Sequence, residues 1–405
     1  MKKIRILAPI IALLLVLTGC QQLLTSVNEY LYADTYISDK YSEEYRDNWQ
    51  YKQLTAQQKE YYGSIYTAIL DTVNTDIQVE FKNENSDMET VYGVRVRFKN
   101  AKMDSDELAL LFEAIFRDNP QFFYLNREYR IEGNTVNGET HYDTIILQFL
   151  FPLEKRLTAI DEFETALSKI MESIPNSQDQ YETELLLYDC LANHCTYDTA
   201  AAAKEATEDS MAYTAYGALV EGSAVCEGYA KAMQLLLTKN NIAATSVSGI
   251  SLDSKESHMW NLVTINGANY YLDPTWNDSN DSGSHAYFNI TTEMLERTHK
   301  LDEERLSLPV CTETTDNYFV RNGTFIDTYK RESIAKVIAN HIVDGHTTIQ
   351  LQFNPKTFDN GLLFLKNGNL IFEMVNEELD SHGLTLWGFT LWTDRQSFTL
   401  TLVKA

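Results

Sequence analysis

The stretch SHMWNLVTINGANYYLDPTW, residues 257–276, decides the predicted fold. Two apolar runs flank Asn266-Gly267, which is the strongest short signal for a tight β-hairpin turn. Because side chains alternate between the two faces of a strand, counting outward from this turn puts His258 and Asp273 on one face as diagonal neighbours. A four-residue loop would keep the same parity. The residues expected on that face are His258, Trp260, Asp273 and Thr275, with Thr275 opposite His258 and Asp273 opposite Trp260.

A histidine beside a carboxylate is the arrangement that a general base needs. Hydrogen bonding to Asp273 would hold the imidazole of His258 in one tautomer and make it more basic. Each residue also has an ordinary interpretation. His258 would then be a histidine at a strand end, and Asp273 a turn-forming residue before Pro274. A nucleophile near the pair would favour the catalytic interpretation.

That nucleophile is found in EGSAVCEGYAKAMQLLLTKNNI, residues 221–242, which reads as a loop running into a helix. Ser223 is the predicted N-cap, and Cys226 then lies in the first turn. The positive end of the helix dipole favours a thiolate at Cys226, and the N–H of this residue points where an oxyanion would form. A cysteine that only packs in the core is the alternative. The residues predicted to form the buried helix face are Val225, Tyr229, Met233 and Leu236.

Three motifs together resemble the transglutaminase-like superfamily of papain-like cysteine enzymes: TAYGALV, EGSAVCEGYA and HMWNLVTINGANYYLDPTW. They cover about residues 212–277, with a looser similarity over 181–300. The resemblance implies an α+β fold in which the helix bearing Cys226 packs on an antiparallel sheet bearing His258 and Asp273. It also implies a nucleophile, a base that later acts as acid, and an orienting carboxylate, in that order. Family members include protein cross-linkers, peptidases and amide hydrolases, and some have lost the triad, so the substrate stays open.

The resemblance implies a second oxyanion donor near the thiol, for which Tyr216 is the candidate. Its alternative role is packing near the strand region after Asp198. Trp260 and Trp276 bracket the hairpin, and we expect one of them to line the substrate groove, although either would also fit a core. A thiol enzyme needs no metal ion or organic cofactor, and we expect none.

The remaining cysteines and histidines are interpreted as structural. Five cysteines in 405 residues are too few for a disulfide scaffold. Cys190, His194 and Cys195 lie close together in sequence, but no second ligand cluster accompanies them, so packing is favoured over a metal site. The histidines without a recognisable partner spacing, expected at the surface or in packing, are His285, His299, His341 and His346.

The first twenty residues predict export. MKKIR is basic, ILAPIIALLLVL is apolar but short for a membrane span, and LTGC follows, which is the order of a secretory signal. Leu17-Thr18-Gly19-Cys20 resembles the bacterial lipobox, which implies cleavage before Cys20 and lipidation of its thiol. The alternative is a signal anchor that is not cleaved. The predicted location is extracytoplasmic, with a lipid anchor in the bacterial membrane.

Length and charge limit the possible domain organisation and the possible partners. A chain of 405 residues is too long for one core, and its formal net charge of −25 argues against a nucleic-acid partner. Mixed helix and strand patterns flank the central motifs, so the flanking domains are also predicted to be α+β, or β-rich at the C-terminal end. The predicted parts are a signal peptide at 1–19, a tether at 20–50, an N-terminal domain at 51–175, the catalytic domain at 176–305 and a C-terminal domain at 306–405.

The function predicted from these features is that of an extracytoplasmic thiol enzyme that attacks a carboxamide or peptide bond through a thioester. Its partner would be a peptide or protein, from the cell wall or the cell surface on grounds of location alone. The alternative is a surface lipoprotein that uses the domain as a non-catalytic scaffold for binding or adhesion. A solute-binding lipoprotein is a third class, but it predicts two similar lobes, and the sequence has no such symmetry.

Overall fold

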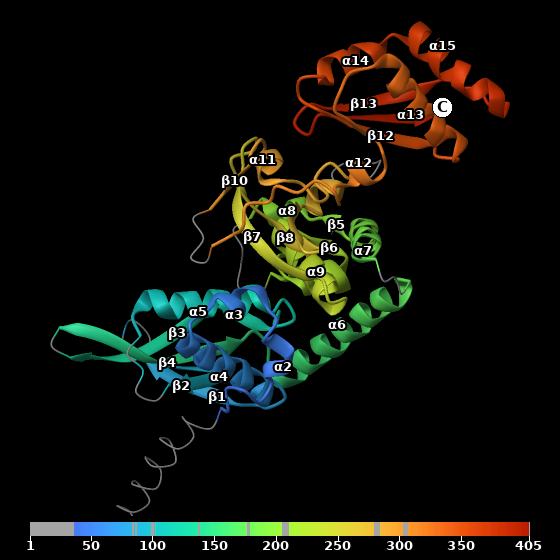
Figure 1. The fold of residues 1–405 in the computed structure, drawn as a ribbon. Coiled ribbons are helices and arrows are strands. Elements are labelled where there is room, and N and C mark those ends of the chain that lie inside the picture. The colour runs from blue at the N-terminus through green and yellow to red at the C-terminus, as the bar shows by residue number, and fades with distance from the viewer. Residues whose placement is uncertain are drawn as a thin grey trace, which may run out of the picture. The chain divides into compact units, whose positions relative to one another are not determined.

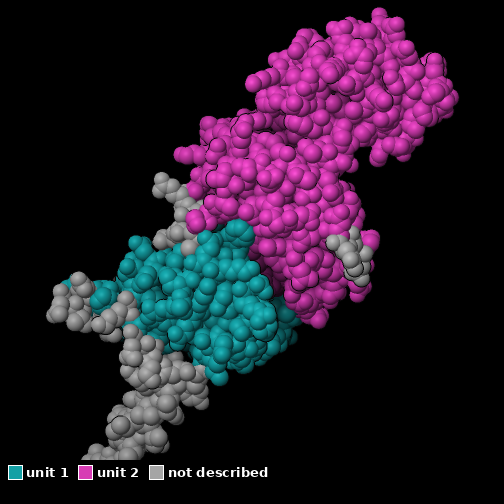
Figure 2. Space-filling model, in the orientation of Figure 1, with its two compact units in different colours: residues 1–118, 124–160 teal, residues 119–123, 161–405 magenta. Residues whose placement is uncertain are grey.

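The computed structural model describes residues 36–404, except 83–84, 86, 99–100, 102, 137, 176–178, 205–209, 279–283 and 303–306. The predicted signal peptide and Cys20 lie outside the described residues. Two compact units are formed, one by residues 1–118 and 124–160 and the other by residues 119–123 and 161–405 (Figure 2). Among the described residues, no helix has both the length and the hydropathy to cross a membrane.

Unit 1 contains a four-stranded antiparallel sheet in the order β1-β2-β4-β3 (Figure 1). Helix α5 begins one residue after Asp104, whose carboxylate accepts a hydrogen bond from the Glu107 N–H, so Asp104 and not Ser105 caps this helix. Residues 36–50, the described end of the predicted tether, fold onto this unit, where Tyr45 is buried. The elements are α2 (Ser42–Tyr45), α3 (Trp49–Gln53), α4 (Ala56–Thr72), β1 (Gln78–Lys82), β2 (Met88–Arg97), α5 (Ser105–Asp118), β3 (Leu125–Val136), β4 (Glu139–Phe149) and α6 (Leu153–Ser173), which continues into unit 2.

The central part of unit 2 is a helix packed on an antiparallel sheet in the order β10-β7-β8-β9. Buried amides join the two: the Asn261 side chain donates to the Ala230 carbonyl, and the Ser246 N–H donates to the Gln234 side chain, both at 2.8 Å. The elements are α7 (Gln180–His194), β5 (Thr196–Tyr197), α8 (Thr199–Ala202), η1 (Met211–Tyr213), η2 (Gly217–Glu221), β6 (Ser223–Ala224), α9 (Cys226–Lys239), β7 (Ala243–Ser251), β8 (Ser257–Ile265), β9 (Ala268–Leu272), α10 (Thr275–Asp278), α11 (Thr292–Leu295) and β10 (His299–Leu301).

The hairpin of β8 and β9 has the predicted two-residue turn. Asn266 and Gly267 both take positive φ angles, 52° and 84°, and the pairing runs from Ile265–Ala268 outward. The pairing ends at Leu272, however, so the prediction that Thr275 continues the strand opposite His258 is wrong. The chain turns into α10 instead, because Pro274 has no N–H for a ladder.

The start of α9 also differs from the prediction. The helix begins at Cys226 itself, and Val225 is the N-cap residue with extended backbone. Ser223 does not cap the helix, because Ser223-Ala224 pairs with Thr196-Tyr197 as a short parallel ladder. The predicted apolar face is confirmed, and all four of its residues are buried: Val225, Tyr229, Met233 and Leu236.

The C-terminal part of unit 2 has its own four-stranded sheet, in the order β11-β12-β14-β13, with β11 parallel to β12 and the other pairs antiparallel. Its core is apolar and includes Ile338, Leu351, Val375 and Leu400. The elements are α12 (Tyr318–Arg321), β11 (Phe325–Ile326), α13 (Arg331–Val343), β12 (Thr348–Phe353), α14 (Phe358–Lys366), α15 (Gly368–Leu379), η3 (Asp380–His382), β13 (Phe389–Asp394) and β14 (Thr399–Lys404). The predicted α+β class is confirmed, while the boundaries at 175 and 305 stay predictions.

Candidate active site

Cys226 is the first residue of α9 and is half-buried. The first N–H groups of a helix have no acceptor within the helix, so they and the helix dipole favour negative charge at this end. Gly228 lets the neighbouring chain pass close to this turn. A Cβ there would lie 2.5 Å from the Ala212 carbonyl oxygen and 2.8 Å from the Ala224 Cβ. Local backbone packing thus fixes the helix start that carries the thiol.

His258 lies on β8, paired with Gly249 of β7, and is buried. Its Nε2 is 2.7 Å from Oδ2 of Asp273, so the hydrogen bond expected between these residues is present. The Cys226 thiol lies close enough to the His258 side chain to contribute to the raised pKa of this imidazole. Because Nε2 is engaged by Asp273, Nδ1 is the nitrogen left for the sulfur. The three residues of the predicted triad therefore meet in the order that the sequence suggested.

The electrostatics of the pair favour a charged imidazolium beside a charged carboxylate. Burial alone would lower the pKa of His258, but the charge and hydrogen bond of Asp273, with a smaller contribution from Cys226, raise this pKa to about 10. Burial alone would raise the pKa of Asp273, but His258 and His299 hold this pKa well below its usual value. His258 thus carries a proton at neutral pH.

Asp273 is oriented from several sides. Its Oδ1 accepts the backbone N–H of Thr275 at 2.9 Å, so the carboxylate also caps α10. Its main-chain carbonyl accepts the hydroxyl of Tyr188 at 2.9 Å. Oδ2 is then left to face His258. The turn that ends the hairpin early is what points the carboxylate at the imidazole.

A second histidine, which no sequence pattern predicted, reaches Asp273. His299 is buried on β10, and its Nε2 lies 3.4 Å from Asp273 Oδ2. The sequence analysis expected His299 at the surface or in packing and did not predict its contact with Asp273. Strand β10 reaches this position only by pairing with β7, which no local pattern predicts. Ligand atoms of His258, Asp273 and His299 lie within 4.8 Å of one another, a spacing that could hold a metal ion.

A groove of about 600 Å³ opens beside His258. Trp276 lines it, as expected. Trp260 does not line a groove, because it is completely buried behind the site, with its ring 5.9 Å from that of His258 and 4.8 Å from that of His299. The acidic side chains of the lining are Asp253, Glu256 and Asp394, and the described lining includes no lysine or arginine.

Tyr216 is not the oxyanion donor that the resemblance implied. Its hydroxyl donates to the carboxylate of Glu162 at 2.6 Å, and its ring packs on Phe123 at 4.9 Å. The one phenolic proton is thereby engaged with a carboxylate. Tyr197, which the sequence analysis did not single out, lines the groove near the thiol. Burial, together with nearby Cys226 and Glu256, raises the pKa of Tyr197 to about 12, so the phenol is neutral at neutral pH.

The other residues considered from sequence have structural contacts. His194 Nε2 meets the Leu219 carbonyl at 2.9 Å, and His341 Nδ1 meets the Val337 carbonyl at 2.9 Å. His285 was expected to lack a partner, but its Nε2 lies 2.8 Å from Asp189 and its ring stacks on Tyr318. The aromatic contact of His346 is with His341. The cysteines that are free thiols, besides Cys226, are Cys190, Cys195 and Cys311.

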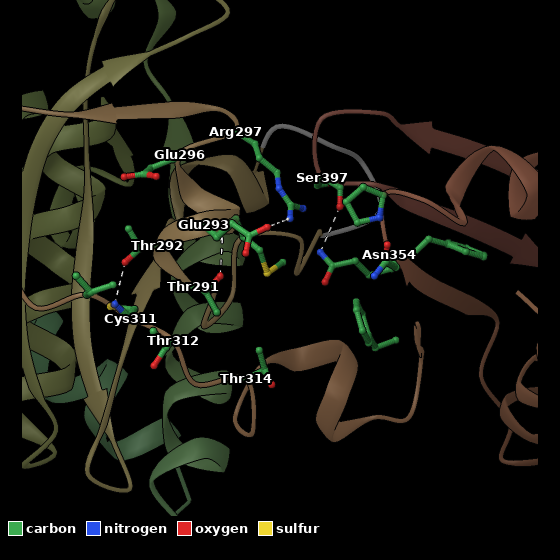
Figure 3. A pocket seen from close by; sticks show the side chains of 16 residues that line it. Thr291, Thr292, Glu293, Glu296, Arg297, Cys311, Thr312, Thr314, Asn354 and Ser397 are labelled. Carbon is green, nitrogen blue, oxygen red and sulfur yellow. Dashed lines mark hydrogen bonds and ion pairs between the residues drawn. The ribbon is translucent and has the colours of Figure 1, made fainter. Parts of the chain in front are cut away.

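A second hollow, of about 610 Å³, contains none of the triad residues (Figure 3). Glu293 and Arg297 form an ion pair at its wall, and the Cys311 N–H donates to the Thr292 hydroxyl at 2.8 Å. Burial raises the pKa of the Cys311 thiol to about 11, so this thiol is a poor nucleophile at neutral pH. Cys311 also has no contact with His258 or Asp273 among those of the described residues, so this hollow is not a second candidate for the thiol chemistry.

Comparisons with known proteins found one family model and several solved structures that are similar to this chain. The sequence model of the transglutaminase-like superfamily matches residues 168–274. A structure titled as that of a TGase is 16% identical, with a TM-score of 0.25, and the match covers 45% of this chain and 51% of that one. A candidate cysteine protease from Cytophaga hutchinsonii is 14% identical, with a TM-score of 0.24 and coverage of 37% and 63%. A candidate protease from Parabacteroides distasonis is 13% identical, with a TM-score of 0.21 and coverage of 36% of each chain.

This chain thus spans about half the length of the TGase structure and less than two thirds of either candidate protease. No curated protein matches the sequence. The family match contains all three residues that meet at the start of α9, namely Cys226, His258 and Asp273. Over residues 168–274, the part of the chain that holds these three residues, the protein is therefore similar to the transglutaminase-like superfamily.

Proposed function

We propose that this protein is an extracytoplasmic thiol enzyme that cleaves or transfers the acyl group of a carboxamide or peptide bond. The observation that carries the proposal is the 2.7 Å hydrogen bond between His258 Nε2 and Asp273 Oδ2, with the Cys226 thiol near the same imidazole. A nucleophile, a base and an orienting group in contact are the parts that covalent acyl transfer requires.

In the first half of the reaction, the Cys226 sulfur attacks the substrate carbonyl carbon. The negative charge that develops on the carbonyl oxygen is stabilised by N–H groups at the start of α9, including that of Cys226. His258 then gives its proton to the departing nitrogen, the C–N bond breaks, and a thioester to Cys226 remains.

In the second half, neutral His258 takes a proton from the incoming nucleophile, which attacks the thioester carbonyl. Water gives a carboxylate and restores the thiol, so the protein acts as a peptidase or amidase. An amine, such as a lysine side chain, gives a new amide and makes the protein a cross-linking enzyme. Asp273 stabilises the imidazolium in both halves without taking the proton.

The groove supports a peptide as the substrate. It has a volume of about 600 Å³, and Trp276 offers an apolar wall beside His258. Asp253, Glu256 and Asp394 give it a negative lining that favours neutral or basic peptides over acidic ones. A cell-wall peptide or a surface protein is the proposed partner, because residues 1–20 have the pattern of an exported lipoprotein.

Alkylation of the purified mature protein tests the chemistry without a known substrate. We expect iodoacetamide to label Cys226 well below about pH 8, where a free thiol is mostly protonated. Cys190, Cys195 and Cys311 in the same molecule serve as internal controls, and peptide mapping assigns each label. The rate at Cys226 should fall sharply in His258→Ala. Labelling of Cys226 no faster than that of a free thiol would favour the alternative, a non-catalytic binding scaffold.

A library of donor peptides, read by mass spectrometry with and without an added amine, separates the two reactions. Loss of ammonia or of a peptide fragment with a gain of water indicates hydrolysis, and incorporation of the amine indicates transfer. The proposed location is tested separately by expressing wild type and Cys20→Ser. Wild type should partition with the membrane and the variant should not, and equal partitioning would contradict the lipid anchor.

A further inference from the structure

His299 is the one buried histidine beside the triad to which the proposed mechanism gives no task. It begins β10, where it pairs with Ser251 of β7, and its side chain is fully shielded from solvent. The rings of Trp276 and Trp260 pack on it at 4.4 Å and 4.8 Å, and that of Tyr287 at 5.7 Å. Water is therefore excluded, and its polar contacts must come from the protein.

Each nitrogen of His299 faces a different group. Nδ1 lies 2.8 Å from the hydroxyl oxygen of Thr298. Nε2 lies 3.4 Å from Asp273 Oδ2, the oxygen that also accepts the hydrogen bond from His258. Within the described structure Nε2 has no well-formed hydrogen bond, and Asp273 is its closest charged neighbour. His299 Nε2, which has no well-formed hydrogen bond, thus faces the carboxylate of Asp273.

The proton on His299 can be placed from these contacts. Thr298 has one hydroxyl proton, which can go to His299 Nδ1 or to the Leu295 carbonyl oxygen 3.3 Å away. In the first case the His299 proton is on Nε2 and faces the carboxylate, which is attractive. In the second, a neutral ring would turn the Nε2 lone pair toward the same negative charge, which is repulsive. The carboxylate therefore selects the form with hydrogen on Nε2.

We infer that His299 is a positioning residue, whose Nε2–H holds the carboxylate of Asp273 ionised and turned toward His258. Two histidines then share Oδ2, while the backbone N–H of Thr275 holds Oδ1 at 2.9 Å. With donors on both oxygens, the carboxylate cannot rotate without losing a contact. The titratable groups that face His299 are Asp273, His258 and Tyr287. This inference rests on the proposed function only for its catalytic consequence.

Two amide substitutions of His299 test the contacts of Nδ1 and Nε2 separately. The side-chain nitrogen of His299→Gln can occupy the place of Nε2 and still donate to Asp273. The shorter His299→Asn can reach only the place of Nδ1, so it keeps a partner for Thr298 and loses Asp273. The pair is matched in polarity, and thermal unfolding of both variants reports any general damage to the core.

The first measurement is the rate constant for alkylation of Cys226 at neutral pH. His299→Asn should lower it about tenfold, and His299→Gln should stay within about threefold of wild type, as expected for loss and retention of one polar contact to a charged group. The second measurement is the downfield proton resonance of the His258 Nε2–H bound to Asp273. It should persist in the Gln variant and broaden or shift in the Asn variant.

A double-mutant cycle distinguishes positioning from mere packing. In an Asp273→Asn background, His299→Asn should slow alkylation no further, because the effect passes through the carboxylate. An equal further loss, or equal behaviour of the Gln and Asn variants, would overturn the inference. Tight binding of one Zn²⁺ per wild-type chain, lost in both variants, would overturn it too, since His299 would then be a metal ligand.

The failure of the proposed function is a separate outcome. If Cys226 in wild type reacts no faster than a free thiol, the catalytic proposal fails. The His258 resonance in the Gln and Asn variants still decides whether His299 positions Asp273. If His299→Asn unfolds, His299→Gln still tests the inference, because it must match wild type in both the alkylation rate of Cys226 and the His258 resonance. The Asp273→Asn background also remains informative.

Discussion

The central sheet and the C-terminal sheet of unit 2 are alike in size but differ in what they bury. Each has four strands and is accompanied by helices. The central sheet encloses the ionisable side chains of His258, Asp273 and His299. Among the described residues of 318–404, no aspartate, glutamate, lysine, arginine or histidine is buried. The polar residues buried there are amides and hydroxyls: Thr324, Gln350, Gln352, Ser397, Thr399 and Thr401.

This difference separates packing from chemistry. Burying a charge is costly unless a partner and hydrogen bonds compensate for it. In the C-terminal sheet, apolar residues such as Leu351 and Leu400 fill the core at no such cost. In the central sheet the His258–Asp273 pair is kept, although an apolar pair would pack as well. A buried ion pair near a thiol is the feature on which the proposed reaction depends, and the C-terminal sheet has no counterpart among its described residues.

Cys226→Ala should have the largest effect. Because the sulfur forms the covalent bond, we expect acyl transfer to fall by about 10⁴-fold or more in kcat/KM. The residue is half-buried and small, so the unfolding temperature should change little. Activity assays with a substrate from the donor library and thermal denaturation measure the two effects. Substantial remaining turnover would mean that the chemistry lies elsewhere in the molecule.

Asp273→Asn should come next, with a loss of about 10³–10⁴-fold in kcat/KM, because the amide leaves His258 without its negative partner. The pKa of His258, raised to about 10 by Asp273, should fall in this variant, as followed by NMR titration of the imidazole. An unchanged pKa would contradict the assignment of Asp273 as its main partner.

The same pKa values predict how stability depends on pH. The raised pKa of His258 contributes stability that is fully present below about pH 6.5 and is lost as the pH rises through about 10. The lowered pKa of Asp273 contributes stability that is present above about pH 4 and is lost on acidification. The free energy of unfolding of wild type, measured with denaturant across pH, should fall both at high pH and at low pH. Both losses should be smaller in Asp273→Asn.

Leu400→Ala tests the C-terminal sheet, which the comparison sets against the central one. Leu400 is fully buried in the apolar C-terminal core, and its truncation should lower the free energy of unfolding by about 2–5 kcal/mol. Under conditions where the variant is folded, the alkylation rate of Cys226 should match wild type. A large change in that rate would show that the two sheets are not independent.

Asn261→Ala and Gln352→Ala form a matched pair, one from each sheet. Both side chains are buried amides that donate to a backbone carbonyl, Asn261 to Ala230 and Gln352 to Ser397. Each should cost about 1–3 kcal/mol in unfolding free energy. Only Asn261→Ala should also slow alkylation of Cys226, because Asn261 ties β8 to α9. Equal effects on alkylation would mean that this tie does not position the thiol.

Asp253→Asn and Glu256→Gln should have the smallest effect. Both side chains are exposed at the groove, so each variant should reduce kcat/KM for basic peptides only a few-fold, and less at high salt. Acidic peptides should gain slightly. Peptide series that differ only in charge, assayed at two salt concentrations, measure this. Identical losses for basic and acidic peptides would exclude a role for groove charge.

Sequence patterns were sufficient where the signal is local. Asn266-Gly267 fixed the hairpin register, and the spacing of Tyr229 and Met233 identified the buried face of α9. Period-two parity correctly predicted that His258 and Asp273 are neighbours, although the turn after Leu272, and not the strand, directs the carboxylate at the imidazole. The errors lie where distant segments intervene. Ser223 pairs with Thr196 instead of capping α9, and the carboxylate of Glu162 accepts the hydroxyl proton of Tyr216.

The sequence by itself determined the central hairpin, the apolar face of the helix and the three residue types of the triad, because turn preference and side-chain periodicity act between near neighbours in the chain. Only the tertiary structure decided that α9 starts at Cys226, that Trp260 is core, and that His299 reaches Asp273. These depend on strand order and on contacts between segments far apart in sequence. Their free energy arises only after the chain has packed, so no local pattern records them.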